Sequence, residues 1–212
     1  MGRSRTTKNL FERQPAKIVK LINPILREAI GEAEQKGCWL IYGPDKNGKT
    51  TLTLMIAQDL AKGEKVGYVS AEEGLDKSFT DACRRAGVNA EDKILWHEYM
   101  NVKEIIEQFS KPKSPRIIII DNLTMYQDEM TPGELKKTLI DGLPNKLLIL
   151  LAHEERRLPY PALGRMASKI AKVIFHVQGL RASVVSRFGP GGVITIDEER
   201  SELYWGEERP KI

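Results

Sequence analysis

Apolar residues along the chain fall into short uninterrupted runs that alternate with longer segments of helical periodicity. The runs predict buried strands at residues 38–42, 65–70, 93–96, 116–121 and 146–152. The periodic segments predict helices at 18–35, interrupted near Pro24, and at 49–61, 75–85, 102–109 and 132–140, the last one capped by Thr131. Strands that alternate with helices in this way are typical of a parallel α/β sheet.

The last part of the chain has a different pattern. Short strands are predicted at 172–177, 182–187 and 193–196, separated by Gly179 and by the glycine-rich segment 189–192. Short strands joined by glycine turns are typical of antiparallel pairing. The fold class that we expect is therefore α/β, with a mostly parallel twisted sheet flanked by helices and a C-terminal antiparallel meander.

Composition and charge add a boundary near the N-terminus. The chain has 212 residues and a formal net charge of +4, and its first twenty residues carry an excess of basic side chains: Arg3, Arg5, Lys8, Arg13, Lys17 and Lys20. We expect residues 1–17 to form a basic, flexible arm and residues 18–212 to form one domain. Such an arm can hold a polyanion through phosphate contacts, or it can be a solvated tail.

Membrane association is not expected from this sequence. No apolar run is long enough to span a bilayer, and the N-terminus lacks the apolar core of a secretory signal. We therefore expect a cytoplasmic protein without a membrane partner.

Residues 43–50, GPDKNGKT, match the phosphate-loop pattern G-x-x-x-x-G-K-[ST] between a predicted strand and a predicted helix. The candidate nucleotide-binding residues are Gly43, Pro44, Asp45, Lys46, Asn47, Gly48, Lys49, Thr50 and Thr51. Backbone N–H groups of this loop can surround a phosphate, Lys49 can reach the β- and γ-phosphates of ATP, and the Thr50 hydroxyl can bind Mg²⁺. The alternative is a lysine-containing turn without function, for which no partners are expected downstream.

Two carboxylates downstream of the phosphate loop are candidates for holding Mg²⁺ and for positioning water. Asp121 ends the apolar run RIIIID, where ligands of parallel sheets bind, and is expected as an outer-sphere holder of Mg²⁺, although a turn or helix-cap aspartate is the alternative. Glu72 follows the next predicted strand and is the candidate that positions the attacking water. Glu73 beside it fits a solvated helix start equally well.

The ordered series of motifs from Trp39 to Trp205 resembles the RecA-like core ATPases, and within them the branch of bacterial RadA (Sms) and the DnaB helicases. YVSAEEG, residues 68–74, is similar to the RadA segment with the catalytic glutamate, and LRASVVSRFGPGG, residues 180–192, is similar to the segment whose arginine reaches a neighbour's ATP. The resemblance implies a RecA-like P-loop NTPase core in which Lys49, Glu72 and Arg187 are catalytic. It also implies that His153 senses the γ-phosphate.

The chain departs from the family pattern at three places. Val185 stands where the motif has a lysine, Asn122 follows the Walker B aspartate, and Asp45-Lys46 replaces a glycine-containing pair in the phosphate loop. Loss of the lysine removes a positive charge from the shared site, so hydrolysis is slow or the charge comes from elsewhere. The chain resembles a core-only form, as in the RadB-like proteins and the RecA-like annealing proteins of phages.

The segment after His153 is expected to face DNA, by resemblance to the family. Its candidate DNA-binding residues are Arg156, Arg157, Tyr160 and Arg165, which offer phosphate contacts and one stacking ring for a single strand. The alternative is a charged surface loop in which Glu154 and Glu155 offset the arginines.

These features together predict an ATPase with ATP and Mg²⁺ as cofactors, which acts on DNA, expected to be single-stranded, in recombination, repair or replication. The arginine from a neighbour implies a homo-oligomer, either a hexameric ring or a filament. A small hexameric helicase or translocase is an alternative, and a nucleotide-switched scaffold or signalling module without DNA is an alternative from another class.

Overall fold

The computed structural model describes residue 4, residues 6–12, residue 14 and residues 16–206. Arg3, Arg5 and Arg13 of the basic arm lie outside these residues, so the flexible arm remains a prediction. The described helices are α1 (Thr7–Phe11), α2 (Pro24–Ile30), α3 (Lys49–Ala61), α4 (Lys77–Arg85), α5 (Val102–Ser110), α6 (Pro132–Glu134), α7 (Ala162–Ile170) and α8 (Glu198–Trp205), with a 3₁₀ turn η1 (Leu123–Tyr126) and a π-helical segment η2 (Leu135–Ile140).

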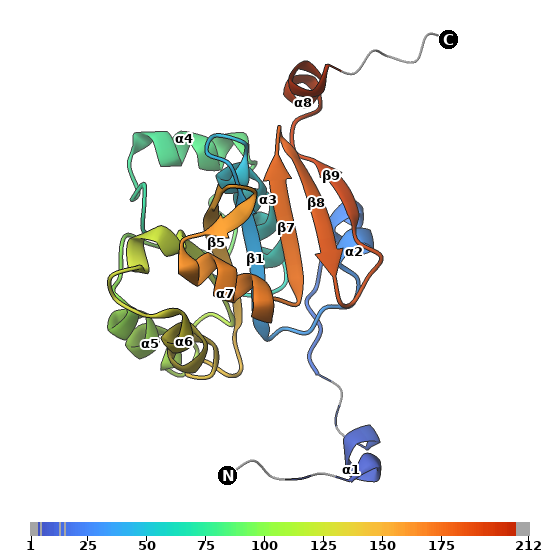
Figure 1. The fold of residues 1–212 in the computed structure, drawn as a ribbon, viewed down its shortest axis with the longest axis vertical. Helices are drawn as coiled ribbons and strands as arrows, with labels where there is room; N and C mark the ends of the chain where they lie inside the picture. The colour runs from blue at the N-terminus through green and yellow to red at the C-terminus, as the bar shows by residue number, and fades with distance from the viewer. Residues whose placement is uncertain (1–3, 5, 13, 15, 207–212) are drawn as a thin grey trace.

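The described strands form one sheet (Figure 1). They are β1 (Gly37–Gly43), β2 (Val66–Ser70), β3 (Ile94–His97), β4 (Ile117–Asp121), β5 (Leu147–Glu155), β6 (Leu158–Tyr160), β7 (Val173–Gln178), β8 (Arg181–Ser186) and β9 (Gly192–Thr195). The order is β3-β2-β4-β5-β1-β7-β8-β9, with β6 paired to β5. The strands from β3 to β7 are parallel, whereas β8 and β9 continue the sheet antiparallel, which confirms the expected fold class.

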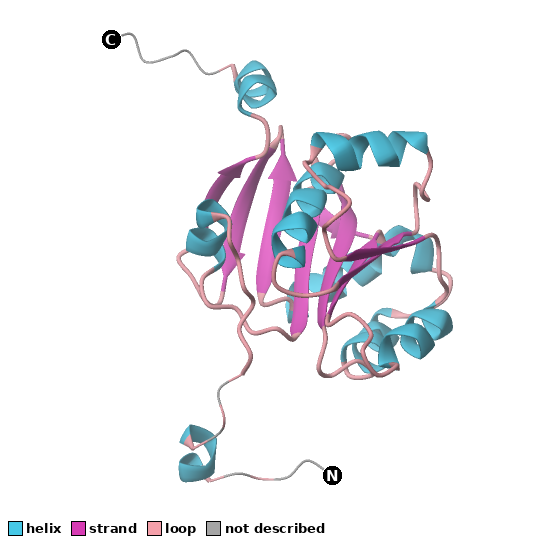
Figure 2. Cartoon of the chain, turned by 180° about the vertical axis from the view of Figure 1, so that it is seen from behind, coloured by secondary structure: helices cyan, strands magenta, loops and turns pink. Residues whose placement is uncertain are grey.

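Apolar side chains cover both faces of the parallel strands. One core lies against α2, α3 and α4 and includes Trp39, Leu52 and Phe79, and the other lies against α5, η2 and α7 and includes Phe109 and Leu163. Figure 1 shows α7 in front of the sheet, and the view from behind in Figure 2 shows α3 across the opposite face. Because both faces of the central strands β1, β2, β4 and β5 are buried, these strands consist largely of continuous apolar runs such as IIIID.

The prediction of a helix over residues 18–35 is wrong for the first and last parts of that range. Only Pro24–Ile30 is helical, because Asn23 caps the helix start and Gly31, at φ 76°, ends it. The residues before the helix are extended and bridge the residues after it, with Ile18 opposite Glu34. The carboxylate of Asp59 in α3 accepts the backbone N–H groups of residues 22 and 23, which holds this extended segment on the core.

The segment after the predicted strand 146–152 has more structure than the sequence indicated. Strand β5 continues to Glu155, β6 pairs back onto it, and α7 follows directly. The helix predicted over 132–140 begins as α-helix and continues as the π-helical η2. Among the described helices, none is long and apolar enough to cross a membrane.

Candidate functional site

The phosphate loop connects β1 to α3 at the carboxyl edge of the sheet, and its shape depends on glycine. A Cβ on Gly43, at φ 158°, would lie 1.9 Å from the Val177 carbonyl oxygen, and one on Gly48, at φ 103°, would lie 2.8 Å from the Leu180 side chain. Gly48 is the N-cap of α3 and supplies no side-chain cap, so the N–H groups of the first helical turn are left for an anion. The loop therefore has the cradle that a polyphosphate needs.

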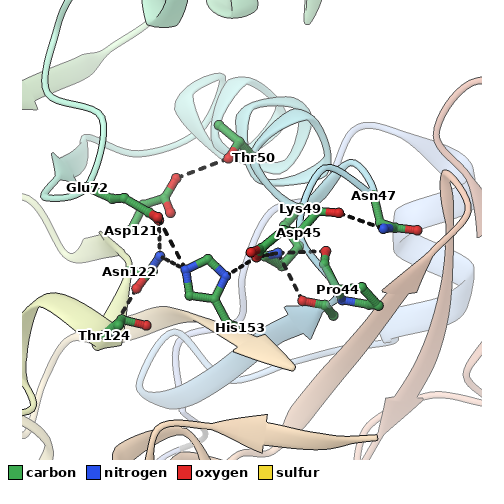
Figure 3. Close-up of polar contacts among 11 residues, drawn as sticks. Pro44, Asp45, Asn47, Lys49, Thr50, Glu72, Asp121, Asn122, Thr124 and His153 are labelled. Atoms are coloured by element: carbon green, nitrogen blue, oxygen red, sulfur yellow. Dashed lines mark hydrogen bonds and ion pairs between the residues drawn. The ribbon is translucent and has the colours of Figure 1, made fainter. Parts of the chain in front are cut away.

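Lys49 is folded onto the loop that it belongs to. Its ammonium donates hydrogen bonds to the carbonyl oxygens of Gly43 at 2.9 Å and Pro44 at 2.8 Å, and it lies 3.6 Å from an Asp45 carboxylate oxygen (Figure 3). Lys49 is only 9% exposed, and burial lowers its pKa while Asp45 opposes that shift. A cation is thus held inside the loop, next to the position expected for phosphate.

Asp121 lies at the end of β4, opposite the start of α3. Its Oδ2 accepts a hydrogen bond from the Tyr68 hydroxyl at 2.7 Å and lies 3.5 Å from the Thr50 hydroxyl. Burial raises the pKa of Asp121 to about 6, although the hydrogen bond from Tyr68 opposes this. A hydroxyl and a desolvated carboxylate this close provide the oxygen ligands and negative charge that Mg²⁺ prefers, so the two residues fit the metal.

Glu72 lies in a polar network that His153 links to the phosphate loop (Figure 3). Asn122 donates a hydrogen bond to one Glu72 oxygen, and the other lies 3.3 Å from Nε2 of His153. The opposite ring nitrogen of His153 makes an ion pair with Asp45. Hydrogen bonding to Glu72 raises the pKa of His153, against the effect of burial. The structure thus brings together the predicted base, the predicted sensor and the loop.

These side chains line one cavity of about 460 Å³ at the carboxyl edge of the sheet. Lys49, Thr50, Glu72, Asp121 and His153 all reach its wall. Because the volume lies within the range of small-molecule sites, the cavity can hold a nucleotide.

Two further arginines line the cavity and were missed from the sequence. Arg85 comes from the last turn of α4, and Arg200 comes from α8. Helix α8 is held beside the loop by Trp205, whose indole N–H donates to the Gly179 carbonyl at 3.2 Å. Gly179 in turn donates its N–H to Asn47 Oδ1 at 2.7 Å, which links α8 to the phosphate loop. The sequence gives no signal for either arginine, since each is one of many charged residues on a helix surface.

Arg187 does not reach this cavity in its own chain. It follows β8, which runs antiparallel to β7, and Ser186 pairs with Val173 at the start of β7. The residue is exposed and lies toward the amino edge of the sheet, the edge opposite the phosphate loop. The segment that carries it is fixed on α2, since Ser186 Oγ donates to the Ile30 carbonyl at 2.6 Å and a Cβ on Gly31 would lie 2.1 Å from the Phe188 oxygen.

The predicted DNA-binding residues fall into two groups. Arg156 and Arg157 form the two-residue turn of the β5–β6 hairpin, at φ values of 51° and 63°. Tyr160 in β6 and Arg165 in α7 line a groove that also contains acidic side chains: Asp128, Glu129 and Glu134. Four residues expected to form one DNA-facing loop therefore occupy a turn and a separate acidic groove.

A glycine-dependent loop between the buried parallel strand β1 and a helix, together with a carboxylate at the carboxyl end of β4, two strands away in the sheet, defines the class of P-loop NTPases. Residues 26–183 match the family model described as the RecA N-terminal domain. The chain belongs to the RecA N-terminal domain family.

Named relatives include RecA proteins of two bacteria. "Protein RecA" of Clostridium botulinum is 31% identical over 155 residues, which are 70% of this chain and 40% of that protein. "Protein RecA" of Xylella fastidiosa is 33% identical over 122 residues, which are 56% of this chain and 33% of that protein. The match thus spans less than half the length of these relatives.

A solved structure described as an ATPase domain has the same fold. It superposes with a TM-score of 0.57 at 14% identity, and the match covers 80% of this chain and 84% of that domain. The family match and this fold confirm the predicted RecA-like P-loop ATPase core.

Proposed function

We propose that the protein binds and hydrolyses Mg-ATP and acts on single-stranded DNA in recombination, repair or replication. The observation that carries the ATPase proposal is the convergence of Lys49, Thr50, Glu72, Asp121 and His153 on one cavity of about 460 Å³. Each comes from a different position of the carboxyl edge, where parallel α/β sheets bind ligands.

In this proposal the phosphate loop binds the β- and γ-phosphates, with the free N–H groups of α3 and the Lys49 ammonium as donors. Thr50 and Asp121 would hold Mg²⁺, which neutralises phosphate charge when it is bound. Glu72 accepts a proton from the attacking water or orients it, because its side chain is 43% exposed and faces the same cavity.

Arg187 would complete the site of a neighbouring copy. Its position toward the amino edge places it away from the phosphate loop of its own chain, so only a second copy can present it to the phosphates. The firm attachment of its segment to α2 supports this role, because a positioned charge loses little conformational freedom on contact. The resulting contact is head to tail, which generates a ring or a filament.

A mixing experiment tests the shared site. We expect Arg187→Ala and Glu72→Gln each to lower turnover by about a thousandfold while ATP binding persists. In a one-to-one mixture, an intact Glu72 site faces an intact Arg187 at roughly a quarter of head-to-tail contacts, so about that share of turnover returns. If the mixture stays inactive while both variants bind ATP and assemble, the shared site is wrong.

The DNA part of the proposal rests on the β5–β6 hairpin. His153 ends the part of β5 that faces the nucleotide cavity, and Arg156-Arg157 follow at the tip of the same hairpin. A change at the cavity can thus reach the arginines through a short stretch of strand. DNA-stimulated hydrolysis that disappears on replacing both arginines supports this proposal, and unchanged stimulation contradicts it.

A further inference from the structure

The amino edge of the sheet carries a line of basic residues that no nucleotide chemistry uses. Five neighbouring parallel strands each begin directly after a lysine or arginine: Lys93 before β3, Lys65 before β2, Arg116 before β4, Lys146 before β5 and Lys36 before β1. We call these five residues the basic row.

Strand register aligns the basic row. The first residues of the five strands pair directly across the sheet: Ile94 with Val66, Val66 with Ile117, Ile117 with Leu147, and Leu147 with Gly37. The basic residues just before them therefore stand at one level. With about 4.8 Å between neighbouring strands, the row extends over roughly 19 Å.

The basic row has few counter-charges among the residues that the structure describes. Among the described residues, no ion pair engages Lys36, Lys65, Lys93 or Arg116. Three carboxylates close to the row along the chain are paired with lysines outside it: Glu64 with Lys17, Asp92 with Lys62 and Glu34 with Lys172. Arg116 attracts Glu64 as well, but at a distance beyond an ion pair.

The row also brings like charges together. Lys146 is fixed by hydrogen bonds to Ser114 Oγ and the Pro115 carbonyl, both at 2.8 Å. Burial lowers the pKa of Lys146, and repulsion from Arg116 lowers it further. Cations held beside each other without an ion pair to a described carboxylate favour a polyanionic ligand.

We propose that the basic row is a binding face for the phosphate backbone of nucleic acid, separate from the hairpin arginines and from the nucleotide cavity. A line of charges one side chain wide suits a linear polyanion, and phosphate contacts of this kind need no base recognition. The face lies on the edge opposite the nucleotide cavity of the same copy, so a nucleic acid strand bound there does not compete with nucleotide for that cavity. The inference does not depend on ATP hydrolysis.

The test compares two variants of equal charge. The row variant carries Lys65→Gln, Lys93→Gln and Arg116→Gln, three exposed residues, and leaves the half-buried Lys146 in place. The control variant carries Lys77→Gln, Lys103→Gln and Lys137→Gln, which are exposed on helices. Binding of a fluorescent oligothymidylate is measured without nucleotide at several salt concentrations.

We expect the row variant to bind the oligonucleotide at least tenfold more weakly than the control variant. The slope of log affinity against log salt should also fall by about 2, since each lost single-strand phosphate contact removes about 0.7. Equal affinity and slope in the two variants would overturn the proposal. So would a row variant that keeps its DNA affinity but loses oligomeric mass by light scattering, which would assign the row to an acidic surface of a second copy. Unchanged thermal unfolding shows that both variants are folded.

Discussion

At the scale of single residues, Asp45 occupies the position of a competing anion. Its carboxylate makes an ion pair with His153 and lies 3.6 Å from the Lys49 ammonium. These are the two side chains expected to contact the γ-phosphate, so ATP must displace the carboxylate before both can bind it. Asp45 is 71% exposed, which allows it to swing away into water.

Replacing Asp45 by asparagine should therefore strengthen ATP binding. Removing one negative charge at contact distance in a solvated site contributes about 1 kcal/mol, or roughly fivefold in affinity. The gain should be larger for ATP than for ADP, because the γ-phosphate is the group that competes. Titration of a fluorescent ATP analogue measures it, and Glu73→Gln is the control, since Glu73 lines the same cavity but makes no ion pair with another described residue. Equal or weaker ATP binding by Asp45→Asn would rule out the competition.

Asp121 leads to a prediction about stability and pH. Its folded-state pKa of about 6 is above the ordinary value of 3.8, so the folded protein binds this proton more tightly than the unfolded chain does. The stabilisation that this group contributes is full below pH 4 and is lost as the pH rises through 6. Asp121→Asn should thus make the nucleotide-free protein more stable by about 2 kcal/mol at about pH 7.5.

Thermal unfolding between about pH 4 and pH 8 checks this expectation. The advantage of Asp121→Asn should shrink toward the acidic end, while Mg²⁺-dependent ATP binding is lost at every pH. A variant that is less stable than the natural protein at the alkaline end would contradict the account. In Asp121→Asn the Tyr68 hydroxyl can still donate to the asparagine oxygen. Tyr68→Phe removes this hydrogen bond but keeps the carboxylate, so it measures the contribution of the hydrogen bond separately from that of the charge.

At the scale of elements, the β5–β6 hairpin places two arginines where the backbone favours glycine or asparagine. Both residues of a two-residue turn with positive φ belong to the geometry preferred by Asn-Gly. Each non-glycine residue there costs about 1 kcal/mol, so the turn geometry does not favour the two arginines.

Arg156→Asn with Arg157→Gly should separate the two effects. The free energy of unfolding should rise by about 1–2 kcal/mol, while oligonucleotide affinity and its salt slope fall by the equivalent of two phosphate contacts. Arg156→Lys with Arg157→Lys keeps charge and strain and should leave both close to the natural values. Chemical denaturation and DNA titration provide the two measurements. If the first variant binds DNA normally, the hairpin is only a turn.

Most strands and the phosphate loop were predictable, because buried strands and glycine spacing leave local signals. Helix α7 was missed since Gly164 interrupts its pattern, although a Cβ there would lie 3.0 Å from the Ala152 Cβ, so the close packing favours the glycine. Helix α8 was missed because its apolar residues are mostly exposed and only Ser201 is buried, which removes the usual periodicity. In the site, the roles of Glu72 and Asp121 were predictable because each follows a predicted strand. The hydrogen bond from Asn122 to Glu72 was not predictable, because it joins residues 50 positions apart in the sequence, and Asn122 stood out only as a departure from the family pattern.

At the scale of the whole molecule, the candidate nucleotide site and the basic residues lie at opposite edges of the sheet. The carboxyl edge holds the nucleotide cavity, and the amino edge holds the basic row and the segment with Arg187. Sequence alone could not align the row, because its members are far apart along the chain and only register makes them neighbours. The division predicts that a protomer has an incomplete site for ATP hydrolysis and needs another copy.

The most direct test is the rate of ATP hydrolysis per protomer at increasing protein concentration, with and without single-stranded DNA at low salt. Lys49→Ala provides the background, because the loop without its lysine cannot hold the phosphates in a reactive position. We predict turnover that rises steeply with protein concentration and rises further with DNA. Turnover per protomer that is independent of both, with ATP binding intact, would contradict a shared catalytic site and a DNA-dependent ATPase.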